Sequence, residues 1–182
     1  MHTPPVRILG LCGSLRTGSS NRALLEVAAG LAPDGVSFII HDGLGDLPLF
    51  RPDVTEVPAV VARFQQGLAA ADAVWIASPE YAHGITGCLK NALDWVVASG
   101  EFSSKPVAAP NTSYASRHAH ESLIEILATM DARVVAPASI RIPLPGSRIT
   151  RAEILADEML CELTRSSLEE LVDALNPRPP AG

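Results

Sequence analysis

The sequence feature that most constrains the fold is the run of residues 73–77, which is apolar at every position. A strand with one face in water alternates apolar and polar residues, so this unbroken run predicts a strand covered by helices on both faces of a parallel sheet. Pro79, which has no backbone N–H, ends the run. A helix is expected soon afterwards, because apolar residues then recur at helical spacing: Leu89, Ala92, Leu93, Val96 and Val97.

The loop between that strand and that helix, residues 80–87, is expected to be exposed. It contains Gly84 and Gly87, which can adopt positive φ and allow a close approach to the backbone. In an open α/β sheet, ligands bind at such loops after the carboxyl ends of the strands. The loop is therefore a candidate binding element.

The order of strand, loop and helix recurs along the chain. Further strands are expected at residues 6–12, 36–40, 107–109 and 133–136, the last continuing through the region of Ile140. Further helices are expected from residue 23 to 31, from near Pro58 to 69, from 118 to 130 and from 151 to 175. The last has a buried side formed by Leu155, Met159, Leu163, Leu168, Leu171 and Leu175. This alternation predicts an α/β fold, a flavodoxin-like three-layer sandwich with a five-stranded parallel sheet in the order 2-1-3-4-5.

The composition indicates one globular domain. A chain of 182 residues with 47% hydrophobic residues can bury a substantial core, so residues 1–182 are read as one domain with loose ends at 1–5 and 176–182. The net charge of −6 argues against nucleic acid or an anionic membrane as the main partner. The sequence shows neither a signal peptide nor a membrane-spanning run, which predicts a cytoplasmic protein. Three scattered cysteines predict neither a disulfide framework nor a metal site.

The loop after the first strand, GSLRTGSSNR at residues 13–22, has the composition of an anion site. A loop between a strand and a helix directs backbone N–H groups at an anion. Gly13 and Gly18 have the spacing of a triphosphate-binding loop, but Ser19 stands where that loop needs a lysine. The remaining hydroxyl, amide and guanidinium groups suit a terminal monophosphate. An ordinary capped turn explains the same residues equally well.

The predicted strand order places this loop and residues 80–87 at one crevice, because strands one and three are neighbours at the switch point. Together, GSLRTGSSNR and PEYAHGITGCLKNALDW make the chain resemble the NADPH-dependent FMN reductase family, flavodoxin-like quinone, azo-dye and chromate reductases. The resemblance covers residues 6 to about 135. It implies noncovalent FMN, NADPH or NADH as the electron donor, a small-molecule electron acceptor, and a homodimer or homotetramer.

The resemblance also implies cofactor-binding residues in three segments. The phosphate of FMN would contact Ser14, Arg16, Ser19, Ser20 and Asn21. The isoalloxazine ring would lie beside Pro79, Glu80, Tyr81, Ala82, His83 and Gly84. The loop after the fourth strand, residues 111–116, would close the other edge, with Asn111, Ser113 and Tyr114 as cofactor-binding residues. The chain departs from the family at Ala82, Gly84 and Thr86, where the family often has Asn, Ser and Pro.

The function expected from this resemblance is an FMN-dependent oxidoreductase that uses NAD(P)H to reduce quinones, free flavin or similar small acceptors. No side chain is assigned as a catalytic acid or base, because a flavin carries the redox chemistry itself. The alternative is a flavodoxin-like electron carrier or binding protein without reductase activity. The modest net charge of −6 and the few aromatic residues, two Trp, two Tyr and four Phe, fit a carrier poorly.

Several residues in these segments invite other readings. Glu80 has no acidic neighbour in sequence, which favours a structural role over a catalytic one. Tyr81 is expected to cover the ring or to pack at a subunit interface. His118, His120 and Glu121 do not predict a metal site, since positions i and i+2 of a helix point apart.

Overall fold

The computed structural model describes residues 4–175, which form a five-stranded parallel sheet in the order β2-β1-β3-β4-β5. This order confirms the predicted flavodoxin-like sheet. The loose ends predicted at 1–5 and 176–182 lie outside the described residues except for Pro4 and Pro5, which are exposed and have no regular structure. The strands are β1 (Val6–Cys12), β2 (Val36–His41), β3 (Ala73–Ala77), β4 (Pro106–Ala108) and β5 (Arg133–Val134).

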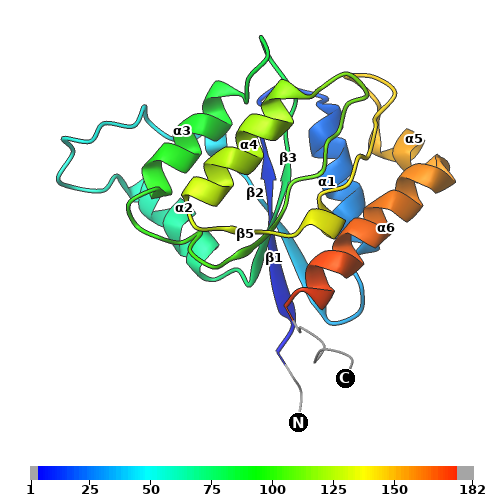
Figure 1. The fold of residues 1–182 in the computed structure, drawn as a ribbon, viewed down its shortest axis with the longest axis horizontal. Coiled ribbons are helices and arrows are strands. Elements are labelled where there is room, and N and C mark those ends of the chain that lie inside the picture. The colour runs from blue at the N-terminus through cyan, green and yellow to red at the C-terminus, as the bar shows by residue number, and fades with distance from the viewer. Residues whose placement is uncertain (1–3, 176–182) are drawn as a thin grey trace.

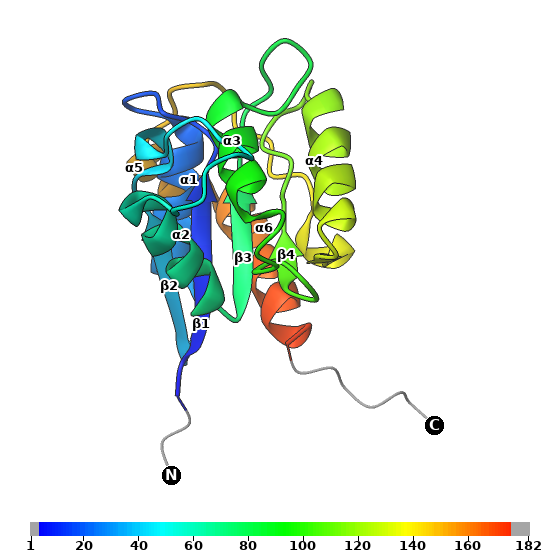
Figure 2. The same ribbon diagram turned by 90° about the vertical axis from the view of Figure 1, so that its left-hand side faces the viewer.

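Two helical layers cover the sheet (Figures 1 and 2). One face is packed against α1 (Ser20–Leu31), α5 (Arg151–Ala156) and α6 (Glu158–Asp173). The other face is packed against α2 (Ala59–Ala69), α3 (Gly87–Val96) and α4 (His118–Thr129). Every residue of β3 is buried, as its unbroken apolar run predicts. Among residues 4–175, no helix combines the length and the apolar character needed to cross a bilayer.

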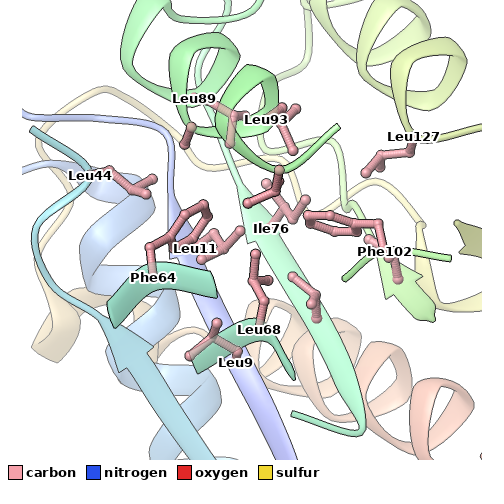
Figure 3. Close-up of a cluster of buried hydrophobic side chains, with 14 of the residues drawn as sticks. Leu9, Leu11, Leu44, Phe64, Leu68, Ile76, Leu89, Leu93, Phe102 and Leu127 are labelled. Atoms are coloured by element: carbon pink, nitrogen blue, oxygen red, sulfur yellow. The ribbon is translucent and has the colours of Figure 1, made fainter. Parts of the chain in front are cut away.

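Successive side chains of a strand point to opposite faces of the sheet, so the apolar strands build both halves of the core. Leu11 and Ile76 point into the layer of α2 and α3, where they meet Phe64 and Leu68 (Figure 3). All four side chains are fully buried, and each contributes on the order of 1.5–3 kcal/mol relative to exposure. Trp75 points to the opposite layer, where its indole Nε1 donates to the Ser167 hydroxyl of α6 over 2.9 Å. The two layers are thus fixed to one central strand.

The fifth strand is shorter than predicted. β5 ends at Val134 and a 3₁₀ turn follows at Ala136–Ala138, so the expected continuation through Ile140 is wrong. Pro137, at the start of that turn, has no N–H for a sheet ladder. The chain then becomes extended again beyond the turn, where Arg141 forms an isolated parallel bridge with Asn111.

The last predicted helix is two helices. Asp157 adopts an extended conformation between α5 and α6, and its carboxylate accepts the N–H of Leu160 as the N-cap of α6. Because of this break, Leu155 and Met159 do not lie on a buried side as predicted; they are 41% and 52% exposed. Val97, expected on the buried side of the helix after β3, follows the end of α3 and is also exposed.

The close approach of the loops after β1 and β3 generates a stability prediction. A Cβ atom on Gly13 would lie 2.2 Å from the Ser78 hydroxyl oxygen and 2.6 Å from the Ser78 Cβ. We expect Gly13→Ala to lower the free energy of unfolding by about 1–3 kcal/mol, because the two strand ends must separate. Gly87→Ala is the matched control, since a Cβ there meets no atom within 4 Å; its effect should stay within about 0.5 kcal/mol. Denaturant unfolding measures both, and equal effects would contradict the steric argument.

Candidate active site

A cleft of about 500 Å³ opens at the carboxyl ends of the central strands. Its walls come from the loops after β1, β3 and β4 and from the segment that follows β5. Ten of the predicted site residues line it: Ser14, Arg16, Ser19, Ser20, Asn21, Pro79, Glu80, Tyr81, His83 and Ser113. Two loops far apart in sequence therefore face one cavity, at the predicted switch point.

One end of the cleft is built by the loop before α1. The first N–H groups of a helix have no partner within the helix, and here they belong to Ser20 and Asn21. The side-chain carbonyl of Asn21 accepts the Thr112 hydroxyl over 2.8 Å, which leaves its amide nitrogen as a donor. Burial raises the pKa of the Cys12 thiol, which stays protonated and donates to the Ser14 carbonyl over 3.4 Å. This end of the cleft is rich in donors, as an anionic group requires.

The wall of the cleft formed by the loop after β3 contains a tight turn with an unusual backbone. Tyr81 and Gly84 exchange two backbone hydrogen bonds of 3.0 and 2.9 Å. Between them, Ala82 and His83 have φ values of 48° and 60°. Positive φ at both central residues is the geometry of a two-residue hairpin turn, for which Asn and Gly are the favoured residues. Gly84 and Gly87 can adopt positive φ but do not; the two residues between the ends of the turn adopt it instead.

The turn is attached to the neighbouring helix α4. The imidazole of His83 stacks on that of His118, with 4.5 Å between ring centroids and 28° between ring planes. His118, the first residue of α4, therefore supports the turn. Within residues 4–175, no three His, Cys, Asp or Glu side chains are grouped as metal ligands.

Glu80 has the structural role that its sequence context favoured. Its carboxylate accepts hydrogen bonds from the Ala119 N–H at 2.8 Å, the Ser116 hydroxyl at 2.9 Å and the Arg117 N–H at 3.1 Å. These donors belong to the beginning of α4 and the residues before it, where a carboxylate also interacts favourably with the helix dipole. Glu80 therefore joins the loop after β3 to the loop after β4.

Four predicted residues lie outside the lining of the cleft: Ala82, Gly84, Asn111 and Tyr114. Asn111 is buried and organises the loop after β4, since its amide donates to the Ser116 carbonyl and accepts from the Ser113 N–H. Tyr114 is 64% exposed. Contact of these four with a bound flavin stays a prediction, as does each individual contact assigned to the residues of the lining.

The lining also includes Thr112, Ala115 and Ser116, which belong to the predicted loop after the fourth strand, and three residues that the sequence did not single out: Leu144, Gly146 and Ser147. The last three follow β5, and Pro145-Gly146-Ser147 is a turn between Leu144 and Arg148. That turn was the available signal. Its position beside the loop before α1 depends on the strand order of the whole sheet.

A model of the NADPH-dependent FMN reductase family matches residues 6–143. The chain belongs to this family. It is 34% identical over 173 residues to a NAD(P)H-dependent FMN reductase of Pseudomonas aeruginosa, covering 91% of this chain and 93% of the relative. A quinone reductase of Escherichia coli K12 is 30% identical over 138 residues, which are 71% of this chain and 73% of the relative.

Solved structures support the fold of this FMN reductase family member. The flavoenzyme NAD(P)H:(acceptor) oxidoreductase FerB of Paracoccus denitrificans superposes with a TM-score of 0.73 at 24% identity, over 92% of this chain and 98% of that one. An archaeal flavodoxin has a TM-score of 0.61 at 16% identity, over 92% and 99% of the two chains. Both likenesses concern the flavodoxin-like architecture alone.

The family's cofactor agrees with the cleft. FMN carries a terminal monophosphate and a flat ring, and the cleft offers a donor-rich end beside a wall of Pro79, Tyr81 and His83. The protein is therefore an oxidoreductase with FMN as its cofactor and NAD(P)H as its electron donor.

The hydrogen bonds of Glu80 predict how stability depends on pH. The Ala119 N–H, with the Ser116 hydroxyl and the Arg117 N–H, holds the pKa of Glu80 below its usual range. A carboxyl pKa that is lower in the folded protein stabilises the fold above the unfolded pKa, and this stabilisation is lost as pH falls through the folded pKa. We expect Glu80→Gln to lower Tm at pH 7, and the difference from the unmodified protein to shrink below about pH 4.

Glu162→Gln is the control for this series, because Glu162 is exposed on α6. It should leave Tm unchanged at both pH values. A Glu80→Gln difference that stays constant from pH 7 to acid pH would show that the charge of Glu80 does not contribute.

Proposed function

We propose that this protein is an FMN-dependent reductase that takes electrons from NADPH or NADH and reduces quinones, free flavin or similar small acceptors. The proposal treats residues 1–182 as a single FMN-binding domain. The observation that carries it is the meeting of the donor-rich loop before α1 and the turn after β3 in one cleft. Family membership supports the reaction class, and relatives named FMN reductase and quinone reductase support the kinds of acceptor.

The side chains would act by binding and orienting. FMN held in the cleft would supply the redox chemistry, a transfer of reducing equivalents between a nicotinamide and an acceptor. Arg16 offers a planar guanidinium to the phosphate, and the amide of Asn21 is held in place by Thr112. Pro79, Tyr81 and His83 would flank the ring and leave one side open. Donor and acceptor would occupy that side in turn, which gives ping-pong kinetics.

The alternative, an electron carrier or binding protein without reductase activity, is not favoured. The family that matches residues 6–143 is one of reductases, and the likeness to flavodoxin is one of fold at 16% identity. A carrier would bind FMN and lack steady turnover with NAD(P)H and a quinone.

The function is tested by anaerobic spectroscopy of the purified protein. We expect a yellow protein whose absorbance is bleached by NADPH or NADH and restored by a quinone. Steady-state oxidation of the nicotinamide should then require both FMN and the quinone. A protein that takes up no added FMN would refute the proposal, and one that binds FMN without turnover would support the carrier.

We also propose a cytoplasmic homodimer or homotetramer. The segment between β2 and α2 projects from the body of the protein (Figure 1). In this segment Leu49 is 82% exposed and Val57 is 52% exposed. Its base is fixed to α3, because Trp95 donates through Nε1 to the Pro48 carbonyl over 2.7 Å. Exposed apolar side chains on a fixed segment are typical of an interaction surface.

Light scattering after size-exclusion chromatography tests this assembly. We expect a mass of two or four times 19.2 kDa, and a shift towards the monomer when Leu49 is changed to Asp. Leu155→Asp is the control, since Leu155 is an exposed leucine on α5. A monomeric unmodified protein would contradict the proposal.

A further inference from the structure

Residues 144–149, here called the 144–149 strap, lie along the cleft beside the loop before α1. The strap is attached at its beginning, where the buried Leu144 donates its N–H to the Thr112 carbonyl over 3.1 Å. Gly146 has a φ of 150°, which disfavours any residue with a Cβ atom. Gly146 and Ser147 form part of the cleft lining.

The Ser20 hydroxyl attaches the other end of the strap. It donates to the Gly146 carbonyl over 2.7 Å and accepts the N–H of Ile149 over 3.2 Å. A serine hydroxyl has a single hydrogen, and here that hydrogen is already used. Ser20 is 3% exposed, so these bonds are partly shielded from water. The side chain of Ser20 can therefore hold the strap, while only its backbone N–H remains for an anion.

The Ser147 hydroxyl, unlike that of Ser20, has its hydrogen available. Its hydroxyl oxygen accepts Nη1 of Arg16 over 2.9 Å, which leaves the O–H hydrogen free to donate. The exposed Ser147 thus presents a hydroxyl donor next to the one guanidinium assigned to the phosphate. A phosphate oxygen accepts strong hydrogen bonds from both kinds of group.

We propose that the 144–149 strap completes the phosphate site, with the Ser147 hydroxyl as a direct phosphate donor beside Arg16 and the Ser20 hydroxyl as the anchor of the strap. This rests on the proposed function, because it concerns bound FMN. It goes beyond the family likeness, since the family model matches residues 6–143 and ends before the strap.

Comparison of FMN with riboflavin, which lacks the phosphate, tests the role of Ser147. Release of FMN from the loaded full-length protein on dilution gives its Kd by fluorescence. Riboflavin is titrated into the same protein after dialysis. We expect Ser147→Ala to weaken FMN about tenfold or more, because a hydrogen bond to a charged group is lost, and to leave riboflavin within about twofold. Unchanged FMN binding, or an equal loss for both ligands, would overturn the proposal.

Two further variants separate the hydroxyl from the shape of the strap. Ser147→Thr keeps the hydroxyl and should restore FMN binding. Ser147→Asp keeps an acceptor for Arg16 but places a negative charge against the phosphate, so it should weaken FMN more than Ser147→Ala does. Ser166→Ala, at an exposed serine of α6, is the matched control and should bind both ligands normally. The reverse order of the Asp and Ala variants would count against direct phosphate contact.

Hydrogen exchange of the full-length protein, with and without FMN, tests the anchor. We expect Ser20→Ala to speed exchange in the peptide containing Ile149, while Ser147→Ala and Ser166→Ala leave it unchanged without FMN. Unchanged exchange in Ser20→Ala would overturn the anchoring role. The flavin-free measurement does not depend on the proposed function, which instead fails if the unmodified protein binds no FMN.

Discussion

The parallel pairing of β1 with β3 is the constraint on which the binding cleft depends. The strands are in register to their ends, with Cys12 opposite Ala77, and the Gly13 N–H donates to the Ala77 carbonyl over 2.8 Å. From this shared end, the chain after β1 enters α1 on one face of the sheet and the chain after β3 enters α3 on the other. The two loops must separate there, and their separation leaves room for the cleft that both loops line.

Side chains then join the elements that surround the cleft. Thr112 connects the loop after β4 to Asn21 of α1, and Glu80 connects the loop after β3 to the beginning of α4. Among the described residues, no buried side-chain nitrogen or oxygen lacks a hydrogen-bond partner. Hydrogen bonds of this kind cost free energy when one partner is removed, so they hold the loops in one arrangement. The walls of the cleft are therefore positioned by the protein itself.

The strand order and the place of the loop before α1 in the cleft could be predicted because both follow from local patterns. The apolar run of β3 and the small polar residues before α1 can each be recognised from consecutive residues of the sequence. The break at Asp157 also had a local signal, since aspartate is a favoured N-cap, but the apolar spacing across it concealed two helices. The contact between Arg16 and Ser147 spans 131 residues, and no local pattern encodes it.

The left-handed pair Ala82 and His83 has a consequence for the kinetics of flavin binding. Such conformations cost on the order of 1–3 kcal/mol for each non-glycine residue and persist only where the surroundings enforce them. Here the paired backbone of the turn and the stack of His83 on His118 enforce them without any ligand. The turn therefore has this shape before any ligand binds. If flavin binds beside this turn as proposed, association would need only a correct collision, and the lifetime of the complex, rather than the rate of encounter, would set the affinity.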